Sequence, residues 1–583
     1  MEKSEIIRLA NEYIEREDDE GFKNQVKKLL ADENFTELED CFYKSLDFGT
    51  GGIRGVIGGG YNRMNPYIIK KVTQGLATYI NNAAAGKKAG GKPVSVALAH
   101  DSRRCSRLFA ETAASVFCGN GIKTYLFTSL RPTPELSFAV RHLGCISGVV
   151  VTASHNPAEY NGYKVYWDDG GQVVPPQDAG IIAEVNSVKS ITSMPLDEAV
   201  KKGLFQLIDK EVDDAFLDMV RSCSLRPELI KKEGKNLKVV YTPLHGAGRV
   251  WVEKALSSLG IEVITVPEQA EPDGEFPTVK FPNPEEGSAL SLALELGKKV
   301  KANLVVGTDP DSDRLGTAVP EGDGFKLITG NQLGCMFIYY VLSTLKEQGK
   351  LTPDTAIIKT VVTTELQRLI GESFGVRVYD VLTGFKNIAS LMKIFETTGE
   401  KFVYGGEESY GYLFSTQVRD KDGVAAAVMA CEMALYNASR GMSLLDYMNE
   451  IYEKYGYFQE SPFSFTFKGS SGGAKIKKIM EDLRANLPKS IGGIAVASST
   501  DFKDGVVKKG IQLAPSNVLQ FVLADGSYVT ARPSGTEPKI KFYISCCEKA
   551  GVPLDEAKKR VAAKCQAIKE DLERILGVCF LLL

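Results

Sequence analysis

Four stretches of this sequence gather polar and charged side chains of types that can do chemistry, and the first of them interrupts an apolar run. Residues 150–166 read VVTASHNPAEYNGYKVY, where a strand of buried character breaks into a loop that carries Ser154 and is closed by Pro157. Open α/β sheets place ligands at the carboxyl ends of their strands, so this position favours a functional Ser154. A Ser/Asn-rich turn that only reverses the chain is the alternative interpretation.

The surroundings of Ser154 exclude one kind of nucleophile and favour another. The GxSxG elbow of hydrolases is absent, and His155, as the immediate neighbour, is expected to point elsewhere and to be a poor base for Ser154. A serine that accepts and returns a phosphoryl group is chemically different, because that reaction depends on positioning and on charge neutralisation by a metal and by cations. This interpretation requires a metal site elsewhere in the chain.

The second stretch, ANLVVGTDPDSDRLG, supplies candidate metal ligands directly after an apolar strand. Residues two apart in extended backbone face the same side, so the carboxylates of Asp309, Asp311 and Asp313 can converge on one hard cation. An EF-hand also begins D-x-D-x-D, but its sixth and twelfth positions, Gly and Glu, are Arg314 and Pro320 here. Magnesium suits a few carboxylates plus a phosphate oxygen, and Arg314 can donate to that phosphate. We therefore expect one Mg²⁺ per chain, shared by Ser154 and the three aspartates.

The third and fourth stretches could bind a sugar and a phosphate. In YGGEESYGY, Glu407 and Ser409 offer the acceptors and donors that grip vicinal sugar hydroxyls, although a plain turn explains this stretch equally well when it is taken alone. The loop ARPSGTEPKIKFY combines a guanidinium, hydroxyls and backbone N–H groups just before a strand, which makes an anion nest suited to a phosphate monoester. The nest residues are Arg532, Ser534, Gly535, Thr536 and Lys539.

An internal triplication should position these loops. Three segments, each a β-rich run, a polar turn, a helical stretch and a second strand, predict βαβ units with crossover helices in parallel or mixed sheets. They begin at PVSVALAHD, LKVVYTPLHG and TAIIKTVVTT. After about residue 455 the texture changes to strands joined by Gly-containing turns, which predicts an α+β domain. The expected fold is α/β with four domains, at residues 1–205, 206–322, 323–455 and 456–583.

Composition narrows the class of protein and its partners. The 583 residues are 44% hydrophobic and 25% charged, as in ordinary globular proteins, and the net charge of −3 gives no general attraction for nucleic acid. The start, MEKSEIIRLANEYIERE, predicts an amphipathic helix rather than a signal peptide, and the tail CFLLL is too short to span a bilayer. Eleven cysteines without CxxC zinc spacing indicate reduced thiols. We expect a cytoplasmic protein that binds neither membrane nor nucleic acid, as a monomer or weak homo-oligomer.

Taken together and in this order, the four stretches resemble the α-D-phosphohexomutase superfamily, and the resemblance covers nearly the whole chain. In that family TASHNP is the phosphoserine loop, D-x-D-x-D-R binds magnesium, GEES or GEMS reads the sugar and R-x-SGTEP holds the distal phosphate. The resemblance implies four domains around a deep cleft, three of them similar α/β units. It also implies that Arg54, in FGTGGIRG, is the N-terminal cleft arginine and that Lys164, in NGYK, takes part in proton transfer.

The chain departs from some relatives in two loops that bear on proton transfer. Gly411 ends the sugar loop where some phosphomannomutase relatives have His, and Thr383-Gly384-Phe385 stands where they have TGH. Because Phe385 cannot do acid-base work, proton transfer is expected to fall to Lys164 with help from Arg54, or to another group. Lys386 is a candidate phosphate or sugar contact beside Thr383 and Gly384. His155 is kept with the catalytic candidates because it lies in the phosphoserine loop.

The GTGGIRG form, the N-terminal extension and GEESYG resemble the phosphoglucomutase-2-like group most. The resemblance implies a phosphoglucomutase that interconverts α-D-glucose 1-phosphate and glucose 6-phosphate through phosphoserine and glucose 1,6-bisphosphate, the latter also serving as activator. Phosphomannomutase, phosphopentomutase and glucose 1,6-bisphosphate synthase share this chemistry and stay open. Two further alternatives are an aspartyl-phosphate phosphotransferase acting through Asp309 or Asp311 and a sugar-phosphate sensor that transfers nothing.

Overall fold

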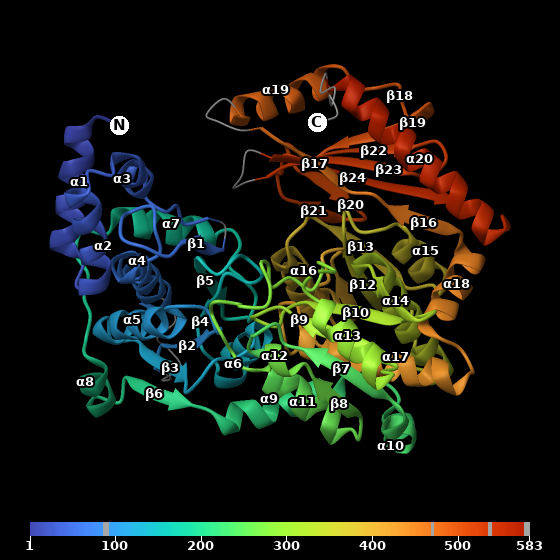
Figure 1. Ribbon diagram of the computed structural model, residues 1–583, viewed down its shortest axis with the longest axis horizontal. Helices are drawn as coiled ribbons and strands as arrows, with labels where there is room; N and C mark the ends of the chain where they lie inside the picture. Colours follow the sequence, from blue (N-terminus) through green and yellow to red (C-terminus); the bar gives the residue numbers. More distant parts are fainter. Residues whose placement is uncertain (50, 86–92, 468–471, 535–538, 577–583) are drawn as a thin grey trace. The chain divides into compact units, whose positions relative to one another are not determined.

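A computed structural model describes residues 1–49, 51–85, 93–467, 472–534 and 539–576 (Figure 1). The chain forms two compact units, each built from several segments. The first comprises Met1–Thr329, Ile388–Thr398 and Ser409–Leu435, and the second comprises Gly330–Asn387, Gly399–Glu408 and Tyr436–Leu583. Within the described ranges, no helix has both the length and the apolar character that a membrane crossing needs.

Three short helices open the first unit: α1 (Lys3–Arg16), α2 (Glu20–Ala31) and α3 (Phe35–Phe42). Asp19 caps α2 by accepting hydrogen bonds from the first backbone N–H groups of that helix. The buried Tyr13 ring makes edge contacts with Tyr61 and Tyr67, which lie beyond the three helices. The N-terminal helices therefore pack on the segment that follows them.

The first sheet delivers the Ser154 loop. Its middle strands, β2 and β4, are buried along their whole length, as expected for a sheet covered on both faces. β5 runs in the opposite direction to the other five strands of the sheet. In sheet order the strands are β1 (Gly52–Val56), β5 (Tyr160–Trp167), β4 (Ser147–Val151), β2 (Ser95–His100), β3 (Lys123–Phe127) and β6 (Phe205–Ile208). The helices are α4 (Pro66–Ala85), α5 (Ser106–Gly119), α6 (Thr133–Leu143), α7 (Gln177–Ser187) and α8 (Leu196–Lys201).

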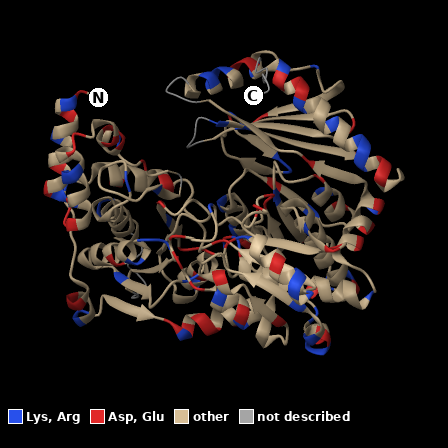
Figure 2. Cartoon of the chain, viewed as in Figure 1, with Lys and Arg blue, Asp and Glu red and all other residues tan. Residues whose placement is uncertain are grey.

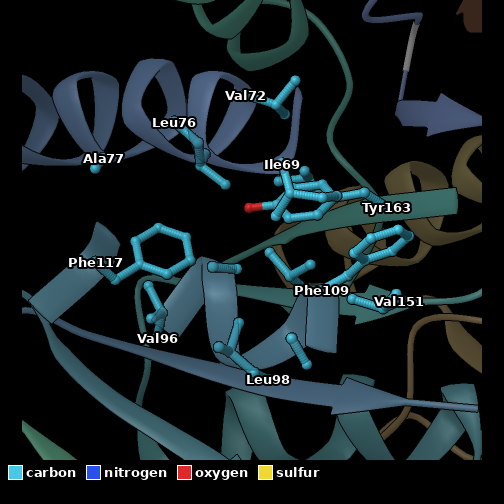
Figure 3. Close-up of a cluster of buried hydrophobic side chains, with 14 of the residues drawn as sticks. Ile69, Val72, Leu76, Ala77, Val96, Leu98, Phe109, Phe117, Val151 and Tyr163 are labelled. Atoms are coloured by element: carbon cyan, nitrogen blue, oxygen red, sulfur yellow. The ribbon is translucent and has the colours of Figure 1, made fainter. Parts of the chain in front are cut away.

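An apolar core holds this sheet against its helices. Figure 3 shows side chains from α4, α5 and the sheet strands meeting in one cluster. Ten of its members are labelled there: Ile69, Val72, Leu76, Ala77, Val96, Leu98, Phe109, Phe117, Val151 and Tyr163. Burying an apolar side chain of this size contributes roughly 1.5–3 kcal/mol. The core thus makes the sheet a rigid support for the loops at its strand ends.

The second sheet delivers the three aspartates. In sheet order its strands are β11 (Gly324–Ile328), β10 (Leu315–Glu321), β9 (Leu304–Thr308), β7 (Lys238–Thr242) and β8 (Glu262–Thr265). β10 runs in the opposite direction to the other four strands. The central strand β9 is fully buried. The accompanying helices are α9 (Lys210–Ser222), α10 (Pro227–Glu233), η2 (Gly234–Asn236), α11 (Gly248–Ser258), α12 (Pro267–Ala270) and α13 (Ser291–Val300).

The third sheet places β12 (Thr355–Thr360) between β13 (Arg377–Val381) and β14 (Lys401–Gly406), all parallel. A short strand, β15 (Tyr412–Leu413), follows β14 in the chain. The helices of this part are α14 (Gly330–Glu347), α15 (Leu366–Ser373), α16 (Phe385–Thr398), α17 (Gly423–Ser439) and α18 (Leu444–Tyr455). Ser443 and Asp446 form a reciprocal capping box at the start of α18.

The C-terminal part forms an antiparallel sheet with two helices. In sheet order the strands are β16 (Tyr457–Glu460), β24 (Lys539–Glu548), β23 (Tyr528–Pro533), β22 (Leu519–Leu523), β19 (Ile494–Asp501) and β18 (Ser490–Ile491). β17 (Phe463–Thr466) also pairs with β24, and β20 (Val506–Lys508) and β21 (Ile511–Leu513) form a separate hairpin. The helices are α19 (Gly472–Ala485) and α20 (Leu554–Ile575). Both acidic and basic residues occur along α1 and α20 in Figure 2, which is typical of solvated helix faces.

The predicted fold class is confirmed: three α/β parts with parallel or mixed sheets precede a C-terminal part of helices and antiparallel strands. Each predicted βαβ unit is present as a parallel strand pair. The pairs are β2 with β3, β7 with β8 and β12 with β13, joined by α5, α11 and α15 respectively. The boundaries of the four domains stay a prediction.

Candidate active site

The loop after β4 presents Ser154 in a constrained conformation. The buried strand ends at Val151, and Ser154 has a φ of +52°, in the left-handed region that non-glycine residues seldom adopt. The Thr152 hydroxyl accepts a hydrogen bond from the Ser154 backbone N–H at 2.8 Å and donates to Asp101 Oδ2 at 2.6 Å. Strain of this kind persists only where the surroundings hold it, and here Thr152 and Asp101 hold the turn.

Arg103 also fixes this loop, although the sequence did not predict it. Its guanidinium donates to the carbonyl oxygens of Ser154 at 2.5 Å, Pro157 at 2.8 Å and Tyr160 at 3.1 Å, and also to that of Asn156. Arg103 is 3% exposed and lies 3.4 Å from the Asp101 carboxylate. The available signal was the polar run HDSRRCSR directly after a buried strand, at the edge where Ser154 was expected.

The three aspartates follow β9 and meet Ser154, so the predicted juxtaposition is present. Ser154 Oγ donates to Asp309 Oδ2 at 2.9 Å, although the two residues are 155 positions apart. One carboxylate oxygen from each of Asp309, Asp311 and Asp313 lies within 4.8 Å of the others, and all three residues are buried. The backbone N–H groups of Asp313 and Arg314 both donate to Asp309 Oδ1 at 3.1 Å, which closes the loop on itself.

Burying three like charges perturbs their protonation. Burial, with the charges of Asp313 and Asp311 adding to it, raises the pKa of Asp309 well above its ordinary value. Burial also raises the pKa of Asp311, but Lys164 outweighs it and the net shift is downward. The trio is therefore poised for a cation, because each carboxylate is stable only with positive charge beside it.

The residues fit a divalent ion with oxygen ligands. Asp311 Oδ1 and Asp313 Oδ1 are buried, and neither has a hydrogen-bond partner among the described residues. Buried carboxylate oxygens are almost always paired or bound to a metal, because an unpaired one is costly. Three carboxylates beside a serine that could carry phosphate suit Mg²⁺ better than Ca²⁺, which takes more protein ligands.

Two lysines contact the acidic trio, and only one of them was predicted. Lys164, on β5, lies 2.8 Å from Asp311 Oδ2 and 3.5 Å from Asp313 Oδ2. Lys421 lies 3.0 Å from Asp313 Oδ2 and was missed, because nothing in the run VRDKDG distinguishes it from a solvated loop. Burial lowers the pKa of Lys164, but Asp311 and Asp313 outweigh it and the net shift is upward, so Lys164 carries its proton.

The expectation that His155 points away from Ser154 is wrong. His155 Nδ1 lies 3.1 Å from Ser154 Oγ, because the left-handed turn at Ser154 brings the neighbouring side chain back over it. Burial, with Arg314 and Arg54 adding to it, lowers the pKa of His155 to about 2, so the ring is neutral at physiological pH. A neutral imidazole at this distance can exchange a hydrogen bond with the serine hydroxyl.

Arg54 and Arg314 lie at the rim of this cluster. Arg54, on β1, donates from Nη1 to Asn156 Oδ1 at 3.1 Å and so contacts the Ser154 loop. Arg314 lies 3.9 Å from Asp309 Oδ2 and 3.8 Å from Asp313 Oδ1, and its Nη1 forms an ion pair with Glu285. Each guanidinium is thus held beside the trio, where it could donate to an incoming phosphate.

In the second unit, the two predicted sugar-reading loops meet. Glu407 Oε1 accepts a hydrogen bond from the Gly384 backbone N–H at 2.8 Å. Gly384 has a φ of +103°, a conformation that favours glycine, and Thr383 precedes it while Lys386 lies in the first turn of α16. Ser409, two residues after Glu407, belongs to the first unit.

The predicted phosphate nest also lies in the second unit and is described in part. Arg532 is on β23 opposite Lys541 of β24, and the Ser534 backbone N–H donates to the Lys539 carbonyl at 2.7 Å. This bond lies next to the last residue pair of the two strands, Pro533 with Ile540. Gly535 and Thr536, the other two predicted members, lie outside the described residues.

Known proteins share both the sequence and the fold. Three family models match the chain, described as phosphoglucomutase/phosphomannomutase alpha/beta/alpha domain I at residues 45–192, domain II at 214–322 and domain III at 329–455. A phosphopentomutase from Homo sapiens is 35% identical, with 94% of this chain and 92% of that protein covered. A phosphoglucomutase from Staphylococcus saprophyticus is 34% identical, with 89% and 94% covered.

A solved structure supports the fold independently. The open form of parafusin, a phosphoglucomutase from Paramecium, superposes with a TM-score of 0.70 at 16% identity, over 92% of this chain and 96% of that one. At this identity the likeness concerns the fold alone. The matched domains and the full-length relatives together place the chain in the phosphoglucomutase/phosphomannomutase family of the α-D-phosphohexomutase superfamily.

Proposed function

We propose that this chain is a phosphosugar mutase, an isomerase that moves a phosphoryl group between two hydroxyls of one sugar by way of Ser154. The observation that carries the proposal is the 2.9 Å contact between Ser154 Oγ and Asp309 Oδ2 inside a buried group of three carboxylates. A hydroxyl that sits against such a group is placed for phosphoryl transfer, where most of catalysis is positioning and charge neutralisation.

The metal ligands would be Asp309, Asp311, Asp313 and an oxygen of phosphorylated Ser154. When bound, Mg²⁺ would neutralise charge on the transferring phosphoryl group. The chain's own part is to hold the serine: Thr152 and Arg103 fix its turn, and the N–H groups of Asp313 and Arg314 orient the Asp309 carboxylate. We assign one cation per chain, because Asp309, Asp311 and Asp313 form the single cluster of three potential metal ligands among the described residues.

In the first transfer, the free hydroxyl of a sugar monophosphate attacks the phosphorus on Ser154. A P–O bond to the sugar forms, the P–Oγ bond breaks, and the hydroxyl proton passes by way of Lys164 to Ser154 Oγ. After the resulting bisphosphate turns over, Ser154 Oγ attacks its other phosphorus, the P–O bond to the sugar breaks, and the serine proton passes back to the freed sugar oxygen. Free bisphosphate would act as activator by phosphorylating Ser154 whenever the phosphate has been lost to water.

Proton movement is assigned to Lys164 with help from Arg54. Asp311 and Asp313 keep Lys164 protonated in the present charge balance, so it can accept the substrate proton only when their negative charge is offset in the working complex. His155, neutral and 3.1 Å from Ser154 Oγ, is assigned a hydrogen bond to the serine oxygen rather than the role of acid.

Substrate recognition is assigned to the remaining predicted residues. The hydroxyls of the sugar would bind Glu407 and Ser409, with Thr383, Gly384 and Lys386 beside them, and Arg314 would contact a phosphate. The distal phosphate would bind Arg532, Ser534, Gly535, Thr536 and Lys539. The division of the chain at residues 205, 322 and 455 also belongs to the proposal.

Glucose 1-phosphate and glucose 6-phosphate are the first choice of substrate pair, because GEES at 406–409 resembles the phosphoglucomutase form of the loop. A pentose 1-phosphate is the second candidate, because a phosphopentomutase is 35% identical over 94% of the chain. Hexose and pentose phosphates would differ in only a few hydroxyl contacts with the site, and such contacts give modest selectivity.

Steady-state kinetics on purified protein test the proposal. Glucose 1-phosphate, mannose 1-phosphate and ribose 1-phosphate are supplied with Mg²⁺, each with and without glucose 1,6-bisphosphate, to wild type and to Ser154→Ala. We expect isomerisation of glucose 1-phosphate with the highest kcat/KM, stimulation by the bisphosphate, and loss of all turnover in the variant with its fold retained. Near-normal activity of Ser154→Ala would refute the serine relay, and higher kcat/KM for ribose 1-phosphate would replace the hexose by the pentose.

A further inference from the structure

The loop that carries the aspartates is held at three consecutive carbonyl groups. Each of these carbonyl oxygens accepts a backbone N–H from the start of a different helix: α11, α6 and α17, taken along the loop. The bonds are Ala247 N–H to Pro310 O at 2.8 Å, Thr133 N–H to Asp311 O at 2.8 Å and Gly423 N–H to Ser312 O at 3.1 Å. All six residues belong to the first unit.

This arrangement uses groups that a helix cannot satisfy by itself. The first N–H groups of an α-helix have no intrahelical partner and carry partial positive charge. Three such ends at one loop stabilise both its backbone and the negative charge of its carboxylates. The approach is close enough to restrict the residue type, because a Cβ added at Gly423 would lie 2.7 Å from the Ser312 carbonyl oxygen and one at Gly246 would lie 2.3 Å from Pro310 Cα.

Thr133 alone among the three helix starts also reaches a carboxylate with its side chain. Its hydroxyl donates to Asp311 Oδ2 at 2.9 Å, and the residue is 0% exposed. Asp311 Oδ2 also accepts from Lys164 at 2.8 Å, whereas Asp311 Oδ1 has no partner among the described residues. Two donors therefore fix Oδ2 of this carboxylate and leave Oδ1 available to a cation.

We propose that Thr133 is a positioning residue that orients Asp311 for the divalent cation, by binding Oδ2 so that Oδ1 is presented to the metal. The inference rests on the proposed function for the identity of the site, and it adds a residue that lies outside the ligand set. Outer partners of this kind typically change metal affinity by about 10- to 100-fold when they are removed. Lys164 can reorient when the cation enters because its stem is flexible, whereas Thr133 is fixed by its helix start.

The test measures metal affinity without turnover. Unphosphorylated wild type, Thr133→Val and Thr133→Ser are titrated with Mn²⁺, and free Mn²⁺ is counted by its electron paramagnetic resonance signal. Thr133→Val keeps the shape and removes the donor, so we expect its Kd to rise about 10-fold or more. Thr133→Ser keeps the hydroxyl, and its Kd should stay within about 3-fold of wild type.

Thr317→Val is the matched control. Thr317 lies on β10 of the adjoining sheet, is 1% exposed, and its hydroxyl has no hydrogen-bond partner among the described residues. The same chemical change there should leave the Mn²⁺ affinity and the activity unchanged. An equal loss in Thr317→Val would mean that the effect is general packing, and it would overturn the proposal.

The remaining outcomes are also decisive. A Kd of Thr133→Val within about 3-fold of wild type overturns the proposal, as does a failure of Thr133→Ser to restore affinity. If Thr133→Val does not fold, Thr133→Ala is measured instead, because it removes the hydroxyl without adding a methyl group in its place. We expect the same rise in Kd for this variant. Absence of mutase activity in a wild type whose Mn²⁺ binding depends on the Thr133 hydroxyl would refute the proposed function and leave this inference standing.

Discussion

Arg103 offers the sharpest test of how the Ser154 loop is held. Its guanidinium contacts four carbonyl oxygens between residues 154 and 160 and lies 3.4 Å from Asp101. Arg103→Lys keeps the positive charge beside Asp101, but an ammonium is a compact group with three donors and cannot span four carbonyls. At least one charged hydrogen bond is lost, which costs roughly 1.5–3 kcal/mol.

The loss should appear more strongly in turnover than in folding. Ser154 needs its left-handed turn to stay against Asp309, and a displacement of about 1 Å in a reacting group can cost about 100-fold in rate. We expect Arg103→Lys to fold and to lose about 100-fold in kcat with little change in KM. Arg103→Met, which leaves the buried Asp101 carboxylate with the Thr152 and Ser106 hydroxyls but without its positively charged partner, should also lose roughly 3–5 kcal/mol of stability.

The assay is a coupled measurement of glucose 6-phosphate formation, with thermal unfolding followed in parallel. Arg107→Lys is the control, because Arg107 also donates to two carbonyls and pairs with Glu111, but its side chain is 37% exposed and does not contact the Ser154 loop. That variant should keep its kcat within about 2-fold. Unchanged kcat in a folded Arg103→Lys would refute the idea that Arg103 positions Ser154.

Two further predictions concern charge. Burial, and then Asp213, raise the pKa of Glu135 well above its ordinary value of 4.5, so the folded protein binds this proton to higher pH than the unfolded chain does. Its contribution to stability is complete below about pH 4.5 and is lost as the pH rises toward the folded value. Glu135→Gln should therefore gain stability relative to wild type as the pH rises, at no more than about 1.4 kcal/mol per pH unit, as measured by denaturant unfolding from pH 5 to 8; a constant difference would contradict this. Removing divalent ions with a chelator should abolish turnover, and added Mg²⁺ should restore it. At a Mg²⁺ concentration of 100 times Kd, the free energy of unfolding should rise by about 2.7 kcal/mol, which thermal unfolding detects as a higher unfolding temperature. Full activity in chelator would contradict the metal assignment.

The sequence predicted well what depends on local pattern. Alternate spacing after an apolar run located Asp309, Asp311 and Asp313, and the three βαβ units follow from strand and helix periodicity. A strand that ends in a polar loop located Ser154, since strand ends in such sheets share an edge.

What the sequence could not predict depends on contacts between distant segments and on backbone conformation. Arg103, Lys421 and Thr133 lie in ordinary polar runs, and only the packing of several segments brings them to the Ser154 loop or the aspartates. His155 was misplaced because an adjacent residue is expected to point away, and the positive φ of Ser154 reverses that rule. The sequence pattern around Ser154 does not indicate that its backbone adopts the left-handed conformation.

A labelling experiment shows whether Ser154 itself carries the phosphoryl group. The enzyme is incubated with doubly labelled [³²P]glucose 1,6-bisphosphate, quenched in acid and digested, and the labelled peptide is identified by mass spectrometry. We expect acid-stable phosphate on Ser154 and no label in Ser154→Ala. Label that hydroxylamine removes, on Asp309 or Asp311, or a protein that binds the sugar and takes no label, would contradict it.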